Sequence, residues 1–475
     1  MTSDSPSASV IGAGPNGLAA AIVLAQAGFK VDVFEAEAQP GGASRTMELT
    51  LPGFRHDFGS AIHAMAAASP FYSSLPLARH GLKWVDGAAP LAHPLIDGSA
   101  VMLERELDEA ETALGRDGRG WRKLVGPVVE RWQEFTEDAL GPVSPIPRHP
   151  FLMARFGYFA FQPAIRLAKS VFTGERARAL FGGLAAHSFL GLDQPLSSAI
   201  GLVLGAAAHV VGWPVPRGGA QAIPDALIAH LRGLGGEVHV GRRIASLDQI
   251  GPVGGLILCD LTPRQMLSVA GDRLRPGYRR AMERFRYGSG AFKIDYALSD
   301  PIPWRAAECR RAICVHVGGT IEEIAQSEYA QAHGTVSDRP FLLVAQPTLF
   351  DPTRAPAGKH TAWVYCHVPN GSAVDMTGHI EAQLERFAPG FHDCVLARRI
   401  SAPADLESMD ANLVGGDVGG GELSLRQFGF RPAIGAYFTG TSGLYLCSAS
   451  TPPGGGVHGM CGFHAAKMAL RRALK

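Results

Sequence analysis

The pattern of hydrophobic and polar positions changes period twice within the first 35 residues. The small apolar run 8–11 is typical of a buried strand, and the apolar stretch 18–27 predicts a helix packed on a sheet. Gly28 ends this helix, and 30–34 predicts a second strand. A strand, a helix and a strand in this order indicate a βαβ unit, and therefore an α/β fold built on a parallel sheet.

A glycine motif joins the first strand to the helix. In Gly12-x-Gly14-x-x-Gly17 the first glycine allows a tight turn, the second lets the backbone approach a pyrophosphate, and the third lets the helix pack on the strand. Glu35 lies 23 residues after Gly12, where a carboxylate can bind the ribose hydroxyls of a dinucleotide. A plain tight turn is the alternative interpretation. The predicted nucleotide-binding residues are Gly12, Gly14, Pro15, Asn16, Gly17, Glu35 and Ala36.

A second glycine pair, Gly41-Gly42, follows soon after Glu35 and precedes Arg45. This segment resembles the extension that holds the diphosphate of FAD in flavoproteins of the glutathione-reductase and amine-oxidase type. A Pro-Gly-Gly turn without a ligand is the alternative. In those flavoproteins a segment like 54–63 passes beside the flavin ring. The resemblance therefore implies FAD as the cofactor, and it adds Gly42, Ala43, Arg45, Ser60 and Ala61 to the site.

Two later segments are expected to return to the nucleotide domain. A helix over 221–234, a Gly-Gly stop and a strand at 237–240 resemble the second FAD segment of the same flavoproteins, with the backbone near Ile244 against the adenine. The strand 444–448 leads into a glycine-rich turn and a last helix. This turn matches G-x-G-x-x-G literally, but only 16 residues follow Gly459, which is too few for a second dinucleotide unit. We expect it to face the flavin instead, through Ser448, Gly456, Val457, His458 and Gly459.

The rest of the chain predicts an interleaved substrate domain. The expected division is 1–71, 213–285 and 436–475 for the Rossmann-type FAD-binding domain, 72–212 for a helical substrate- or membrane-facing region, and 286–435 for a sheet that floors the substrate cavity. The fold class is thus α/β, a glutathione-reductase/amine-oxidase-like FAD domain interleaved with an α+β substrate domain. The glycine-rich loop 415–421 is compatible with close backbone packing and with a flexible lid.

An aromatic and basic stretch stands out within the helical region. Five phenylalanines and one tyrosine fall within 151–172, and 148–178 contains six Lys or Arg and one acidic residue. An interfacial membrane helix needs this combination. An amphipathic helix that covers a substrate cavity is an equal alternative, and the two are compatible. A net charge of +1 gives no reason to expect a nucleic acid partner, and the sequence leaves the oligomeric state open.

The cysteines indicate a reducing compartment. Their number is odd, no CxxC pair occurs, and no spacing suggests a metal site. Cys309 and Cys314 have CxxxxC spacing, but they lie some 300 residues from where disulfide-active flavoproteins carry their pair, so we interpret the spacing as coincidental. The N-terminus lacks the apolar core of a secretion signal. A cytoplasmic protein, with contact to a membrane surface as an option, is therefore expected.

The opening motif, Arg217-Gly218-Gly219 and above all 444–462 resemble the phytoene desaturase-related flavoproteins over essentially the whole chain. The nearest branch resembles pyridine nucleotide-disulfide oxidoreductase domain-containing and carotene ketolase-like proteins. The resemblance implies an FAD-dependent oxidoreductase that desaturates or oxidises an apolar polyene or isoprenoid lipid by hydride transfer to flavin N5. An amine oxidase or saturase, and a non-catalytic flavoprotein, are the alternatives. One departure is that 448–451 lacks the acidic residue that binds the ribitol in many members. No catalytic residue is predicted.

Overall fold

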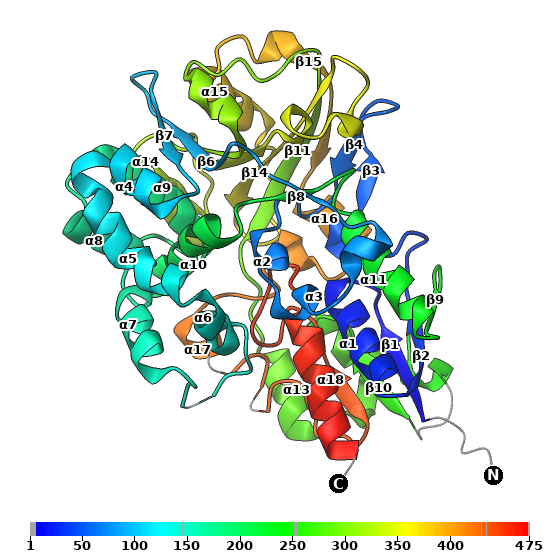
Figure 1. Ribbon diagram of the computed structural model, residues 1–475. Helices are drawn as coiled ribbons and strands as arrows, with labels where there is room; N and C mark the ends of the chain where they lie inside the picture. Colours follow the sequence, from blue (N-terminus) through cyan, green and yellow to red (C-terminus); the bar gives the residue numbers. More distant parts are fainter. Residues whose placement is uncertain (1–5, 145, 251–254, 429, 434, 474–475) are drawn as a thin grey trace.

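The computed structural model describes residues 6–144, 146–250, 255–428, 430–433 and 435–473. Figure 1 shows a nucleotide-binding part that carries both chain ends, a second sheet above it and a group of helices to one side. Along the chain, segments of the nucleotide-binding part alternate with segments of the other two parts, as expected for an interleaved α/β fold.

The nucleotide-binding part is built on a five-stranded parallel sheet with the order β16-β10-β1-β2-β9. Three segments of the chain contribute to it, as the sequence predicts. Its strands are β1 (Ser7–Ile11), β2 (Lys30–Phe34), β9 (Glu237–His239), β10 (Leu256–Cys259) and β16 (Leu444–Leu446). β10 and β16 are buried over their whole length and read as short apolar runs, whereas β2 at the edge side of the central β1 alternates polar and apolar residues.

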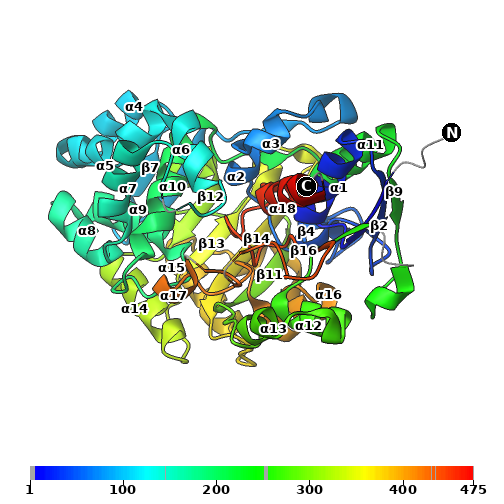
Figure 2. The ribbon, with the colours of Figure 1, turned by 90° about the horizontal axis from the view of Figure 1, so that it is seen from below.

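Helices cover both faces of this sheet. One face packs on α1 (Pro15–Gln26), α11 (Ala222–Gly233) and α18 (Met460–Ala473), which share an apolar cluster with Val10, Val33 and Leu258. The other face, with Ile11 and Cys259, packs on α12 (Pro263–Ala270) and α13 (Pro276–Glu283). Figure 2 shows the last helix, α18, lying beside the first, α1. The predicted closure of the domain by the end of the chain is therefore confirmed.

The substrate part is built on a seven-stranded sheet with the order β15-β11-β14-β13-β12-β6-β7. Its neighbours pair antiparallel except β12 and β6. The strands are β6 (Ala89–Pro94), β7 (Ala100–Leu103), β11 (Gly290–Leu298), β12 (Ala312–Val317), β13 (Leu342–Ala345), β14 (His360–Val368) and β15 (Val395–Ser401). Strands were expected at 291–298, 341–345 and 361–365, and all three are present.

Helices lie on both faces of this second sheet. The outer face packs on α15 (Thr377–Phe387), and the inner face packs on a larger group of helices. That group consists of α4 (Leu107–Ala113), α5 (Gly118–Glu130), α6 (Trp132–Ala139), α7 (Pro150–Ala160), α8 (Ala164–Val171), α9 (Glu175–Ala186), α10 (Ser197–Val210) and α14 (Ile321–Ala332). Short elements complete the fold: β3 (Thr46–Glu48), β4 (Arg55–Asp57), β5 (Trp84–Val85), β8 (Val215–Pro216), α2 (Ala64–Ala67), α3 (Pro70–Ser73), α16 (Pro403–Met409) and α17 (Leu425–Phe428).

The region 72–212 differs from the helical expectation in one respect. β6 and β7 lie within it and extend the substrate sheet through the parallel pairing of β6 with β12. Every side chain of both strands is buried, so neither strand shows the alternation that distinguishes a strand from a buried helix segment. A second, smaller difference is that α5 begins at Gly118, within the turn that the glycines at 115–120 predict.

Candidate functional site

The first glycine motif has the geometry of a dinucleotide site. A side chain at Gly17 would overlap the carbonyl oxygen of Gly12, so helix α1 packs against the turn as the motif predicts. The Glu35 carboxylate lies at the end of β2 and accepts hydrogen bonds from the N–H of Ala13 at 2.8 Å and of Glu37 at 2.9 Å. These two contacts fix the carboxylate beside the turn, where a ribose would lie.

The second glycine pair folds back onto the first motif. A Cβ at Gly42 would lie 3.4 Å from the Cα of Gly14, so two glycine turns meet without side chains between them. The Ala43 carbonyl accepts hydrogen bonds from Gly59 and Ser60, which brings the 59–61 loop to the same place. The meeting of two glycine turns suits a diphosphate, because backbone N–H groups can approach such a ligand closely where side chains are absent.

Arg45 has a different environment from a free phosphate-binding cation. Its guanidinium donates to the carbonyl oxygens of Gly42 and Met409, at 2.9 and 2.6 Å, and stacks on the ring of Phe58. The side chain is 4 % exposed. In this structure Arg45 therefore ties the second glycine turn to α16.

The C-terminal turn borders the same space. Gly456, Val457 and His458 line a large cavity, and Gly459 approaches Tyr72 and Ala19 so closely that a side chain would overlap them. His458 accepts a hydrogen bond from the N–H of Met460 through Nδ1, and its carbonyl oxygen accepts one from Ser69. Burial lowers its pKa to about 4. His458 thus fixes the start of α18 as a neutral side chain.

The remaining predicted residues lie near the same edge of the sheet. Ile244 is buried in a cluster with Phe34, and the neighbouring N–H of Arg242 donates to the carbonyl oxygen of Glu35 at 2.7 Å. Ser448 is buried beyond the end of β16, and its carbonyl oxygen accepts the N–H of Thr451. The structure brings together Gly12, Gly14, Pro15, Asn16, Gly17, Glu35, Gly42 and Ala43, and it places Ala43, Ser60, Ala61, Gly456, Val457 and His458 on the cavity wall.

Two buried carboxylates at this edge were missed by the sequence analysis. Asp260 follows β10 and accepts the N–H of Gly17 at 2.8 Å. Its pKa is raised to about 7, mainly by burial and with contributions from the nearby carboxylates of Asp410 and Glu35, while the hydrogen bond from Gly17 opposes the shift. Burial also raises the pKa of Asp410, whose carboxylate lies close to Gly42. The position of Asp260 at the carboxyl end of a predicted strand was a usable signal for it.

The cavity has a volume of about 1380 Å³ and runs between the two parts of the molecule. At one end lie the Ser60 loop and the turn 454–458, and at the other lie the inward faces of α6 and α7, including Phe156 and Ala160. Most of the side chains between them are apolar. The loop 415–421 closes one side, and the Asp417 carboxylate binds the N–H groups of Gly288, Gly419 and Gly420. Close backbone packing, one of the two alternatives for this loop, is therefore the observed arrangement.

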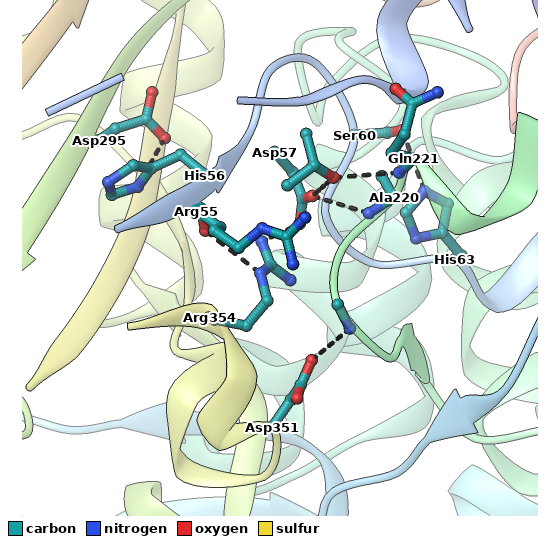
Figure 3. Close-up of polar contacts among 12 residues, drawn as sticks. Arg55, His56, Asp57, Ser60, His63, Ala220, Gln221, Asp295, Asp351 and Arg354 are labelled. Atoms are coloured by element: carbon teal, nitrogen blue, oxygen red, sulfur yellow. Dashed lines mark hydrogen bonds and ion pairs between the residues drawn. The ribbon is translucent and has the colours of Figure 1, made fainter. Parts of the chain in front are cut away.

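A buried polar network joins the nucleotide-binding part to the substrate sheet (Figure 3). The Asp57 carboxylate forms an ion pair with Arg354 at 2.7 Å and accepts the N–H of Ala220 and the hydroxyl of Thr46. Burial disfavours the ionised Asp57, but the Arg354 charge and these hydrogen bonds hold its pKa below the ordinary value. Both partners are 1 % exposed, so the pair fixes the loop after β4 against the substrate part.

Lys293 is the charged side chain of this region that reaches the cavity. It projects from β11, lines the cavity wall and forms an ion pair with Asp295, which lies 3.7 Å from His56. Burial lowers the pKa of Lys293 and raises that of Asp295 to about 6. The predicted strand 291–298 contained both residues, but nothing in its pattern indicated which face would meet the cavity.

Comparisons with known proteins agree with this architecture. Residues 10–75 match the model of the NAD(P)-binding Rossmann-like domain. Over 97 % of this chain and 93 % of the relative, the sequence is 26 % identical to rat (Rattus norvegicus) pyridine nucleotide-disulfide oxidoreductase domain-containing protein 2. It is 25 % identical to the neurosporene-forming phytoene desaturase of Rhodobacter capsulatus, with 95 % of this chain and 91 % of that protein covered.

A solved structure confirms the fold. An oxidoreductase from Methanosarcina mazei superimposes with a TM-score of 0.67 at 17 % identity, over 98 % of this chain and 100 % of that one. No helix in the described part of the chain is both long and apolar enough to cross a membrane. Over nearly its whole length the chain is similar in sequence to phytoene desaturase-related oxidoreductases, and its fold and glycine turns agree with that similarity.

Proposed function

We propose that the nucleotide site holds FAD and that the enzyme oxidises an apolar substrate in the cavity. Three features support FAD. The two glycine turns meet where a Cβ at Gly42 would touch Gly14, and Glu35 is fixed beside the first turn. Among the described residues, three buried polar atoms lack a hydrogen-bond partner: Asn16 Oδ1 in the first glycine motif, Ser450 Oγ in the segment after β16, and Nε of Arg431, which lines the cavity. Such groups suit a large polar ligand, because an unpaired buried polar atom is costly.

The observation that carries the proposal is the continuity of the cavity. One mostly apolar space of about 1380 Å³ reaches from the turn 454–458 to helix α7. A long hydrophobic molecule can therefore lie with one end against the flavin position and its length against α6 and α7. This fits the polyene or isoprenoid class of lipid, and the phytoene named for the bacterial relatives is the first candidate.

The protein's own groups bind, orient and exclude water in this proposal. Bound FAD supplies the hydride acceptor at N5. Apolar residues such as Phe156, Trp213 and Leu343 hold the carbon chain, and the loop at Asp417 shields the flavin side from solvent. Neither a Ser-His-Asp set nor a pair of facing carboxylates is required for such a reaction, in agreement with the sequence analysis.

The test begins with the purified protein. We expect a yellow protein with bound FAD, released by denaturation and identified by its absorbance and mass. Under anaerobic conditions, phytoene delivered in detergent should bleach the flavin absorbance, while putrescine should not. A colourless protein that does not take up added FAD would overturn the cofactor, and an unbleached flavin with every apolar polyene would overturn the reaction.

One observation favours an amine as a second candidate. Trp363 and Tyr365 lie side by side on β14 with ring centroids 4.9 Å apart, and both line the cavity close to Lys293. Aromatic faces attract organic cations. The same anaerobic titration with a hydrophobic amine distinguishes this candidate, because only one of the two substrate classes should bleach the flavin.

We also propose that α7 lies on a lipid surface. Phe151 and Tyr158 project outward from α7 with 88 % and 70 % exposure, whereas Met153 and Phe156 of the same helix line the cavity. The exposed Arg166 lies on the next helix, α8, where it suits anionic headgroups. A lipid substrate could pass from the membrane into the cavity beside this one helix.

Vesicle flotation tests this contact. The wild type should float with vesicles containing phosphatidylserine, and Phe151→Ser with Tyr158→Ser should reduce the bound fraction severalfold. The matched control is Val240→Ser with Leu396→Ser, which removes two exposed apolar side chains, 47 % and 46 % exposed, from other elements. An equal loss of vesicle binding in both double variants, or no vesicle binding by the wild type, would contradict the proposal.

A further inference from the structure

A pair of histidines lies in the apolar wall of the cavity, outside the nucleotide site. His187 follows α9 and lines the cavity, and its Nε2 is 2.9 Å from Nε2 of His316 on β12. The ring of Trp213, another cavity residue, packs edge-on against both imidazoles, with centroids 5.5 and 5.6 Å away. Two nitrogens at this distance share one hydrogen, so the protonation of one ring sets the tautomer of the other.

The surroundings hold the inner histidine in place. His316 is fully buried, and Phe341 packs edge-on against its ring. Gly183 of α9 makes room for it, because a Cβ there would lie 2.7 Å from its Nδ1. His316 therefore fixes the orientation of His187 through the shared hydrogen.

Both rings are neutral at physiological pH. Burial, with a smaller contribution from the neighbouring His367, lowers the pKa of His187 to about 3. Burial likewise keeps the pKa of His316 well below its ordinary value, with His187, His93 and His367 contributing. The pair thus presents no charge to the cavity and gives no attraction for a carboxylate.

Both Nδ1 atoms of the pair lack a hydrogen-bond partner among the described residues, but that of His316 is buried away from the cavity wall, so the one that can reach a ligand is Nδ1 of His187. It has no hydrogen bond to any described residue, and it is absent from the set of fully buried polar atoms without a partner. Many other residues of the cavity wall, such as Val203, Leu204 and Leu343, are apolar. Because the shared hydrogen can belong to either ring, Nδ1 can act as a donor or as an acceptor without a charge being formed.

We infer that His187 is a specificity residue that binds a neutral oxygen group, a hydroxyl or a carbonyl, on the otherwise apolar substrate. His316 acts through His187 as a positioning residue. The inference rests on the proposed function only in taking this cavity as the substrate site. It narrows the substrate class from a bare hydrocarbon to a polyene or isoprenoid alcohol, aldehyde or ketone.

A binding experiment without turnover tests this inference. The cavity contains Trp213 and Trp363, so a polyene that enters it should quench tryptophan fluorescence. The ligands are all-trans-retinol and axerophthene, the hydrocarbon that differs from it by the hydroxyl. In His187→Leu the ratio of the retinol Kd to the axerophthene Kd should rise roughly fivefold to tenfold, the usual effect of losing one neutral hydrogen bond.

Three further variants separate recognition from structure. His187→Asn places an amide where Nδ1 stands and should restore most of the retinol preference, whereas Gln194→Leu, which removes another polar side chain from the cavity wall, should leave the ratio unchanged. His316→Leu should lower the preference partly, since His187 is then free to turn. Thermal melting checks that each variant is folded.

An unchanged ratio in His187→Leu, or equal weakening of both ligands, would overturn the inference. Failure of the proposed function has a different signature. If no polyene bleaches the flavin but the retinol ratio shifts as described, the reaction is wrong and the histidine assignment stands.

Discussion

Gly462 in helix α18 packs directly against the backbone of Asn16 in helix α1, with no room for a side chain between them. A Cβ at position 462 would overlap the carbonyl oxygen of Asn16 and approach its carbonyl carbon. Asn16 belongs to the first glycine motif, and Gly462 follows the last one. This contact joins the two ends of the chain, so the spacing of α1 and α18 sets the position of the turn 454–458 relative to the nucleotide.

Gly462→Ala should therefore separate the two helices. The obstacle is backbone, which cannot rotate away, so we expect the free energy of unfolding to fall by about 1–3 kcal/mol, the usual cost of overpacking. Urea denaturation measures the loss, and the flavin content should fall with it. Gly233→Ala is the matched control. Gly233 is exposed at the end of α11 with no atom within 4 Å of the added Cβ, and alanine should stabilise that helix by up to about 1 kcal/mol. A Gly462→Ala protein as stable as the control would contradict the close packing.

Glu35→Ala should weaken FAD retention. The carboxylate is held by two N–H groups beside the first glycine turn, and a charged hydrogen bond to a ribose hydroxyl contributes roughly 1.5–3 kcal/mol. We expect the Kd for FAD to rise about tenfold to a hundredfold, measured by titration of the flavin-free protein. Glu237→Ala, which removes an exposed carboxylate from β9 of the same sheet, should leave the Kd unchanged. Equal affinity in the Glu35 variant would remove this residue from the site.

The nucleotide part could be predicted because its signals are local. Gly12, Gly14 and Gly17 are close in sequence, and the change from a strand period to a helix period marks the boundaries around them. The return of 237–240 and 444–448 to the sheet was predicted from resemblance rather than from pattern alone. The strand pairing confirms this return, since β9 and β16 each pair in parallel with a neighbouring strand.

The cavity and its polar groups could not be predicted, because their partners are distant in sequence. Asp57 and Arg354 are 297 residues apart, and His187 and His316 are 129 apart. Neither pair shows a spacing that a helix or strand would reveal. Lys293 occupies a fully buried strand, where a period of two no longer separates the cavity face from the core face. Such contacts follow only from the relative placement of the two sheets.

Arg354→Met should strongly destabilise the protein. It leaves the buried Asp57 carboxylate with hydrogen bonds but without its counter-charge, and breaking a buried pair in this way costs about 3–5 kcal/mol. Chemical denaturation at pH 7 measures the effect. The control is Arg131→Met, which breaks the exposed pair with Glu134 and should cost less than about 1 kcal/mol. If the two variants lost similar amounts of unfolding free energy, the buried pair would contribute no more to stability than the exposed one.

Asp260→Asn should change how stability depends on pH. Burial raises the pKa of Asp260 from 3.8 to about 7, so the folded protein binds a proton more tightly than the unfolded chain. The stability of the wild type is then greatest, as far as this group is concerned, below pH 4 and falls as the pH rises toward 7. Asparagine cannot ionise, and its side-chain oxygen can still accept the N–H of Gly17. The variant should lack this decline.

The free energy of unfolding of the variant should therefore exceed that of the wild type only slightly at pH 4 and by about 4 kcal/mol at pH 8, since one pKa unit corresponds to about 1.4 kcal/mol. Urea midpoints at these two pH values give the comparison. Parallel pH profiles for the two proteins would mean that Asp260 ionises normally, and that the N-terminus of α1 accommodates its charge.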